Sequence, residues 1–175
     1  MKNFKDKVAV ITGAGSGIGR ALAMELAASG AKLAISDINE AGLKETANNL
    51  NLGEDRLMTK ILDVADRQAF YDFADDVVNH FGQANMIFNN AGVALGATVE
   101  DMNYDDFEWL MNINFWGVVY GTKAFLPYLK QSGEGHIINI SSIFGLVGIP
   151  TQSAYNAAKF AVRGFTESLR IELEM

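Results

Sequence analysis

Residues 8–23 of the chain read VAVITGAGSGIGRALA. The first five are apolar or β-branched, a pattern that predicts a buried strand. Four of the next seven positions are glycines, and the small and apolar residues after them have the spacing of a helix that ends at Gly30. A strand, a tight turn and a helix in direct succession typically begin a unit whose consecutive strands run parallel.

The rest of the chain alternates between the same two patterns. Short apolar runs predict further strands at residues 32–36, 57–62, 86–89 and 136–141. Helices are expected at residues 17–29, 39–49, 66–81 and 104–130, with a break near Asn114, and from residue 152 to the end; Asn39 and Asp66 are the expected N-caps and Gly82 a helix end. This alternation predicts one α/β domain over residues 1–175, a doubly wound Rossmann-type parallel sheet with helices on both faces. Such sheets bind ligands beyond the carboxyl ends of their strands.

Composition narrows the function classes. Charged residues make up 20% of the 175, the formal net charge is −7, and no basic block occurs, which argues against nucleic acid and membrane surfaces as partners. The absence of cysteine excludes disulfides and thiolate chemistry. His80 and His136 stand apart from each other, so we expect no metal site. We expect neither a signal peptide nor a membrane-spanning segment, and we expect a cytoplasmic protein.

The glycine-rich turn has the spacing T-G-x-x-x-G-x-G, with Gly13, Gly17 and Gly19. Glycines at a strand-to-helix turn let a ligand approach the backbone, and the helix N-terminus then presents N–H groups to a pyrophosphate. We expect Ser16 and Ile18 to contact the same cofactor. A turn that serves packing alone is the alternative.

Asp37 follows the second strand and can accept hydrogen bonds from both hydroxyls of an adenosine ribose. Its charge would repel a 2′-phosphate, and Ser16, rather than a basic residue, precedes Gly17. Both features favour NAD over NADP. The alternative for Asp37 is a helix cap.

The later strands are followed by further candidates. Asp63 and Val64 follow the third strand, where the carboxylate could accept from an adenine amino group or form a turn. Asn89 or Asn90 could tie neighbouring strands together, and Ala91 and Gly92 allow close backbone approach. Two hydroxyls, Ser141 and Ser142, follow the fifth strand, and the spacing of Tyr155 and Lys159 puts both on one face of the last helix.

With these residues the chain closely resembles the single-domain branch of the short-chain dehydrogenase/reductase family. The motifs T-G-x-x-x-G-x-G, N-N-A-G, a serine thirteen residues before Tyr155 and Y-x-x-x-K occur in the expected order. The resemblance implies that Tyr155 donates or accepts the proton and that Ser142 orients the substrate oxygen. Lys159 would support the ionised phenol and hold the nicotinamide ribose, and Asn114, rather than Asn112, would hold a water that connects Lys159 to solvent.

The implied activity is hydride transfer between NAD(H) and an alcohol/ketone pair, with a largely apolar small substrate and a homodimer or homotetramer as the assembly. One ammonium about 4 Å from a phenolate is worth about 4 kcal/mol at an effective dielectric of ~20 but only about 1 in bulk water. The cleft must therefore be partly dry, and the apolar run 143–150 is a candidate for excluding water. A non-catalytic NAD-binding sensor or scaffold is the alternative function.

The resemblance also implies sequence beyond Met175. Family members continue with two more strands and a segment that closes over the substrate. We therefore expect a C-terminal region that this sequence does not contain, with a truncated gene product as the alternative.

Overall fold

The computed structural model describes residues 3–175 and contains a parallel five-stranded sheet. Its strand order is β3-β2-β1-β4-β5. The strands are β1 (Val8–Thr12), β2 (Lys32–Asp37), β3 (Leu57–Ile61), β4 (Met86–Asn89) and β5 (His136–Asn139). The predicted Rossmann-type parallel sheet is confirmed, although β5 ends two residues before the predicted boundary.

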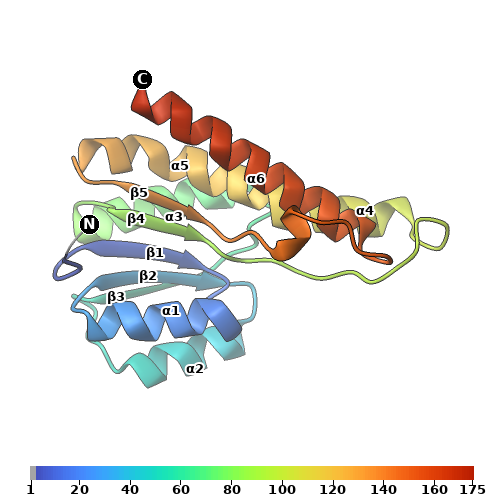
Figure 1. Cartoon of the computed structure of the whole chain (residues 1–175). Coiled ribbons are helices and arrows are strands. Elements are labelled where there is room, and N and C mark those ends of the chain that lie inside the picture. The colour runs from blue at the N-terminus through green and yellow to red at the C-terminus, as the bar shows by residue number, and fades with distance from the viewer. Residues whose placement is uncertain (1–2) are drawn as a thin grey trace.

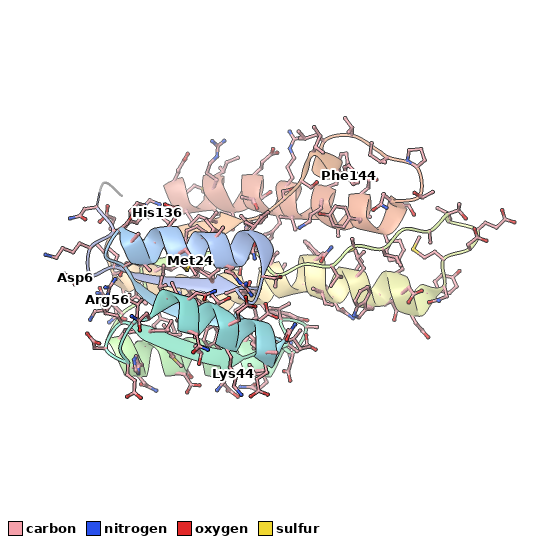
Figure 2. The ribbon with its side chains drawn as sticks, turned by 90° about the horizontal axis from the view of Figure 1, so that it is seen from below. Asp6, Met24, Lys44, Arg56, His136 and Phe144 are labelled. Carbon is pink, nitrogen blue, oxygen red and sulfur yellow. The ribbon has the colours of Figure 1, made fainter. Side chains whose placement is uncertain are left out.

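Helices cover both faces of the sheet (Figure 1). They are α1 (Gly17–Ala28), α2 (Glu40–Leu50), α3 (Arg67–Phe81), α4 (Tyr104–Met111), α5 (Gly117–Gln131) and α6 (Ser153–Glu174). Helices α1 and α2 lie on one face, and α3 and α5 lie on the other, with α6 beside α5 (Figure 1). Seen from below, α1 and α2 shield the sheet, and Met24 and Lys44 project from them (Figure 2).

Alternation along β1 explains why two helical layers form. Val8 and Val10 belong to the core cluster that contains the phenylalanines of α3 and α5. Ala9 and Ile11 belong to the cluster under α1 and α2. Because successive side chains of a strand point to opposite faces, an uninterrupted apolar strand requires cover on both sides.

The helix ends follow local sequence signals. Asn39 Oδ1 accepts a hydrogen bond from the backbone N–H of Gly42 at 3.1 Å, and Asp66 Oδ1 accepts one from Ala69 at 3.0 Å. Gly82 closes α3 with φ = 77°. All three predicted signals are confirmed.

The α-helix expected over residues 104–130 does break near Asn114, but the break is a change of helix type and not a gap between helices. Residues Asn112–Trp116 form a π-helical segment (η1) that joins α4 to α5 without interruption. Wider i→i+5 hydrogen bonding keeps the backbone groups paired while it displaces one side chain from the α-helical register. Asn114 lies within this segment and is fully buried.

The strand order reverses at β1, because β2 and β3 lie on one side of it and β4 and β5 on the other. Loops leaving β1 and β4 therefore separate at the carboxyl edge of the sheet, which is where a crevice forms in such folds. Helix α5 lies close to β4 through Gly121, where no side chain would fit.

Gly121→Ala and Gly164→Ala make the same change on two helices, and we expect opposite effects. A Cβ at Gly121 would lie 2.6 Å from Phe70 Cζ, so the free energy of unfolding should fall by about 1–3 kcal/mol. A Cβ at Gly164 would meet nothing within 4 Å among the described residues, so the free energy of unfolding should rise by up to about 1 kcal/mol through helix propensity. Urea unfolding followed by circular dichroism measures both. A loss in both variants would contradict the expectation for Gly164.

Candidate active site

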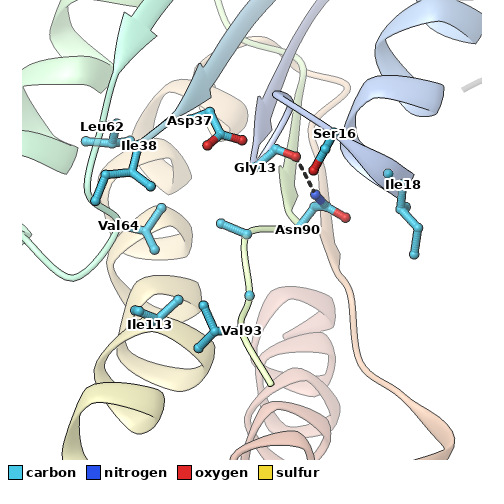
Figure 3. A pocket seen from close by; sticks show the side chains of 13 residues that line it. Gly13, Ser16, Ile18, Asp37, Ile38, Leu62, Val64, Asn90, Val93 and Ile113 are labelled. Atoms are coloured by element: carbon cyan, nitrogen blue, oxygen red, sulfur yellow. Dashed lines mark hydrogen bonds between the residues drawn. The ribbon is translucent and has the colours of Figure 1, made fainter. Parts of the chain in front are cut away.

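A cavity of about 360 Å³ lies at the carboxyl edge of the sheet, where the strand order reverses. Its lining comes from the segments that follow β1, β2, β3 and β4 and from η1 (Figure 3). The lining residues are Gly13, Ser16, Gly17, Ile18, Asp37, Ile38, Leu62, Val64, Asn90, Ala91, Gly92, Val93 and Ile113. Figure 3 shows Leu62, Ile38, Val64 and Ile113 along one side and Ser16, Asn90 and Ile18 along the other.

The glycine turn brings backbone to the cavity wall. Gly13 has φ = 67°, and a Cβ there would lie 2.8 Å from the Cα of Ala91. A Cβ at Gly15 would lie 2.8 Å from Asp37 Oδ2. Gly15 does not line the cavity but lets the turn approach Asp37; the sequence analysis missed this packing role, because the T-G-x-x-x-G-x-G spacing leaves Gly15 among the variable positions.

Helix α1 begins at this turn with its first N–H groups open. Among the residues that the structure describes, no side chain caps α1 at Ser16, and the first turn contains no acidic residue. The positive end of the helix dipole therefore faces the cavity without a competing carboxylate, which suits a phosphate group. Gly19 does not line the cavity; a Cβ there would collide with Asn90 Nδ2 at 2.7 Å, so this glycine lets α1 pack closely.

Asp37 stands at the end of β2 with both carboxylate oxygens near the cavity rim. Oδ2 accepts a hydrogen bond from Gly15 N–H at 2.8 Å, and Oδ1 accepts one from Asn39 N–H at 2.8 Å. The cap of α2 is Asn39, so the alternative interpretation of Asp37 as that helix cap is wrong. Each oxygen keeps a lone pair for a further donor.

Arg20 is the cation nearest to the turn in sequence, and its charge is already paired. Its guanidinium donates to both carboxylate oxygens of Glu45, at 2.9 and 2.8 Å. It also donates to the carbonyl of Gly15 and to Thr46 Oγ1. Thr46 is buried and donates to the carbonyl of Ala14 at 2.8 Å. Arg20 and Thr46 thus bind the carbonyl groups of Gly15 and Ala14 on the side of the turn that faces away from the cavity.

Asp63 and Val64 take different positions after β3. Val64 lines the cavity, whereas Asp63 is exposed and is not among the lining residues. Asp63 Oδ1 accepts from Ala65 N–H at 2.9 Å, the geometry of a turn-forming aspartate. Its contact with an adenine amino group stays a prediction.

The segment after β4 is fixed by two neighbouring asparagines. Asn90 Nδ2 donates to the carbonyls of Thr12 and Gly13 at 2.9 and 3.2 Å, the latter bond drawn in Figure 3. Asn89 Nδ2 donates to Thr122 Oγ1 and Asn139 Oδ1 at 3.2 and 2.8 Å. Both asparagines therefore tie the segment to neighbouring elements, each on a different side.

Asn114 anchors the next part of that segment. Its Oδ1 accepts from Val93 N–H and its Nδ2 donates to the Val93 carbonyl, both at 2.8 Å. A Cβ at Gly92 would lie 3.1 Å from Asn114 Oδ1. The side chain thus holds the wall of the cavity in place, and its role in holding a water stays a prediction.

A second cavity of about 350 Å³ adjoins the first and shares four lining residues with it. It is lined by Ile18, Asn90, Gly92, Val93, Ala94, Ile140, Ser141, Ser142, Tyr155 and Lys159. Three of the four predicted catalytic side chains therefore meet in one cavity, next to the glycine turn.

The three side chains are held from different elements. Ser142 Oγ accepts from Phe144 N–H at 3.2 Å, so its own proton is available to a ligand. The Tyr155 ring meets the edge of Phe144 at 5.7 Å. Lys159 Nζ lies 5.6 Å from the centre of the Tyr155 ring and donates to the carbonyl of Ile140 at 2.9 Å.

Lys159 is almost fully buried, and this burial lowers the pKa of its ammonium from the ordinary value. Burial of this kind lowers the effective dielectric around the ammonium, which is the condition that the electrostatic argument from the sequence names. The apolar run 143–150 does not supply this dryness as predicted. Ile143, Leu146 and Val147 are exposed, the first by 66%, whereas Phe144 packs against Tyr155 and Gly145 lies against the backbone of Lys159.

The two histidines lie away from these cavities. His136 begins β5 at the amino end of the sheet, and Figure 2 shows it at the opposite end of the molecule from Phe144. His80 is on α3 and bonds the carbonyl of Glu54. Within residues 3–175, no group of three or more His, Cys, Asp or Glu side chains is arranged to hold a metal ion. None of the helices described is long and apolar enough to cross a membrane.

These features fit a dinucleotide. Gly17 lines the cavity with nothing described within 4 Å of where a Cβ would stand, the α1 N-terminus lacks a side-chain cap among the described residues, and Asp37 has acceptor capacity at the rim. The two adjoining cavities suit two linked nucleotide halves, and Lys159 and Tyr155 line the second.

Comparison with known proteins agrees with this geometry. A putative oxidoreductase SadH of Mycobacterium tuberculosis is 54% identical over 173 residues, which are 99% of this chain and 63% of that protein. A CLA biosynthesis dehydrogenase/reductase of Lactiplantibacillus plantarum is 39% identical over 99% of this chain and 61% of its own length. The chain thus spans less than two thirds of the length of these relatives.

Solved structures match the fold closely. A short-chain dehydrogenase/reductase from Burkholderia phymatum in complex with NAD superposes with a TM-score of 0.95 at 37% identity, over 99% of this chain and 62% of that one. An NAD⁺-bound xylitol dehydrogenase gives 0.93 at 33% identity, over 99% and 67%. The family model for short chain dehydrogenases matches residues 7–175. The chain therefore belongs to the short-chain dehydrogenase family and carries the dehydrogenase/reductase fold of that family.

Proposed function

We propose that the protein is an NAD-dependent oxidoreductase that transfers a hydride between NAD(H) and an alcohol/ketone pair. The observation that carries this proposal is the meeting of Ser142, Tyr155 and Lys159 in a cavity that adjoins the glycine-lined one. A binding-only protein would not need the hydroxyls of Ser142 and Tyr155 to share a cavity with Lys159.

The cofactor would be held largely by backbone. The glycine turn and the α1 N-terminus would take the pyrophosphate, Asp37 the adenosine ribose, and Val64 and Ala91 would border the cavity between the two halves. Lys159 would hold the second ribose. When bound, the nicotinamide would supply or accept the hydride.

Side chains of the second cavity would bind the substrate oxygen and transfer the proton. Ser142 would donate its free proton to that oxygen and so position it. Among the described residues, the Tyr155 hydroxyl has no hydrogen-bond partner that would compete with substrate, and it would give or take the proton. The Lys159 ammonium would stabilise the phenolate that forms, at an effective dielectric lowered by its burial.

We propose NAD rather than NADP because of the charged groups near the expected position of the adenosine ribose. A 2′-phosphate beside Asp37 would meet a carboxylate, and the nearest guanidinium, Arg20, is bidentate with Glu45. Neutralising that phosphate would require breaking an existing charge-assisted pair.

The proposed substrate is a largely apolar small molecule, because Val93, Ala94 and Ile140 line the second cavity beside the polar groups. A homodimer or homotetramer is proposed as the assembly. Its support is the exposed apolar surface of α6, which includes Phe160 and Ile171. The cytoplasm is proposed as the compartment.

Tyr155→Phe should lower NADH-dependent carbonyl reduction by about 10²–10⁴-fold, because it removes the only proton of that side chain able to reach the substrate oxygen. NADH affinity, measured by fluorescence titration, should stay within twofold. The assay uses the full-length protein and a panel of apolar ketones and aldehydes. Equal activity in the variant would overturn the role of Tyr155. Binding without turnover of any compound by the unmutated protein would favour the sensor or scaffold.

Asp37→Ala should reduce the preference for NADH over NADPH by about tenfold or more, since a hydrogen bond to a charged group is worth about 1.5–3 kcal/mol. The measurement is kcat/KM for each cofactor. Asp63→Ala is the comparison: an adenine contact would weaken both cofactors equally. A preference for NADPH before any substitution would contradict the assignment of NAD.

Lys159→Met should abolish turnover and change how stability depends on pH. The lowered pKa of Lys159 means that the folded state binds fewer protons than the unfolded state between that pKa and 10.5. The contribution of Lys159 to stability therefore rises with pH across this window. Urea unfolding at a series of pH values should show that the free energy of unfolding of the unmutated protein increases, relative to that of the variant, as the pH rises. A constant difference between the two proteins would contradict the burial of a titrating ammonium.

A further inference from the structure

The segment between Ser142 and Tyr155 has little regular structure of its own. After the short 3-10 turn Ile143–Gly145, residues 146–150 are all exposed. Thr151 adopts φ = 66°, a conformation that non-glycine residues rarely take. Because Ser142 precedes this segment and Tyr155 follows it, its conformation sets how the two hydroxyls stand relative to each other.

Asn156, directly after Tyr155, holds the segment by its backbone. Its Nδ2 donates to the carbonyl of Phe144 at 2.6 Å and to that of Val147 at 2.7 Å. Its Oδ1 accepts from Ile149 N–H at 3.0 Å. Both amide hydrogens and the carbonyl oxygen are thus used, and the residue is only 8% exposed, so there is little competition from water for these bonds.

Phe144 transmits this constraint to both hydroxyl groups. Its N–H donates to Ser142 Oγ at 3.2 Å, and its ring meets the Tyr155 ring edge-on. Its carbonyl is the group that Asn156 binds. One residue therefore contacts Ser142, Tyr155 and Asn156 through its N–H, its ring and its carbonyl.

Asn156 touches neither cavity. It is absent from the residues that line the two cavities within the described chain, so a contact with cofactor or substrate cannot explain its burial. An asparagine in a helix also gives up helix propensity relative to alanine. Its three bonds to the segment are the interaction that offsets this cost.

We propose that Asn156 is a positioning residue that fixes the Ser142–Tyr155 geometry by clamping residues 144–149. The proposal rests on the proposed function, because only a reaction at one substrate oxygen requires the two hydroxyl groups to keep a fixed position relative to each other. Displacement of reacting groups by about 1 Å costs about 10²-fold in rate, so loosening the clamp lowers kcat and leaves cofactor binding intact.

The test compares Asn156→Ala with Asn85→Ala in the full-length protein. Asn85 is also buried and also binds backbone, accepting from Val8 N–H at 2.9 Å, but it precedes β4 at the opposite end of the sheet. The substrate is whichever ketone in a panel of cyclohexanone, acetophenone and 2-decanone the unmutated protein reduces fastest. Asn156→Ala should lower kcat about 10–100-fold with the Kd of NADH unchanged within twofold. Asn85→Ala should keep kcat within twofold even where it lowers the melting temperature.

Hydrogen–deuterium exchange gives a readout that does not depend on turnover. Asn156→Ala should raise deuterium uptake in residues 143–149, at Ile149 above all, and Asn85→Ala should not. If Asn156→Ala does not fold, Asn156→Asp replaces it, because it keeps the acceptor for Ile149 and loses both donors; the expected changes have the same direction.

An unchanged kcat, or a loss of kcat equal to that in Asn85→Ala, would overturn the positioning role. If the unmutated protein reduces no ketone, the proposed function fails, and exchange alone decides the clamp. Unchanged uptake in residues 143–149 then overturns it.

Discussion

The buried hydroxyl of Thr12 accepts hydrogen bonds from the backbone N–H groups of Asn90 and Ala91, each at 3.1 Å, and Asn90 returns two bonds to the turn after β1. This link joins the ends of β1 and β4 at the point where the strand order reverses. Both cavities take part of their wall from it. If the two strand ends separated, the glycine turn and the second cavity would no longer share a boundary.

For the proposed contacts, the first cavity relies mainly on backbone groups, whereas the second depends on side chains. The first cavity is shaped by glycines and an open helix end, whose N–H groups cannot be lost by substitution of a side chain. The second depends on groups from α6 and from the end of β5, which reach the crevice from the other half of the sheet. Lys159 illustrates the cost of this arrangement: burial disfavours its charge, although the proposed chemistry uses that charge. Protein stability and the proposed catalysis therefore make opposite demands on this one residue.

Local signals were predicted well because their physics is local. The caps of α2 and α3 need only a side chain that reaches three residues along the chain, and Asn39 and Asp66 do so. The break near Asn114 was predicted in position but its π-helical geometry was not, since no residue type marks an i→i+5 bond. The apolar run 143–150 was expected to dry the cleft, but hydrophobicity alone cannot say which residues are covered. Gly15 and Asn156 were not predicted, because each contacts a segment that only folding brings next to it.

The sequence by itself determined the succession of strands and helices along the chain and the identity of the residues that follow each strand. It also predicted that ligands bind beyond the carboxyl ends of the strands. Periodicity and glycine spacing are properties of residues that are near neighbours along the chain. Only the tertiary structure decided that Asp37 bonds Gly15, that Asn114 holds Val93 and that Asn156 clamps the segment before Tyr155. These hydrogen bonds depend on the packing of side chains against backbone groups of other segments, which composition and spacing do not encode.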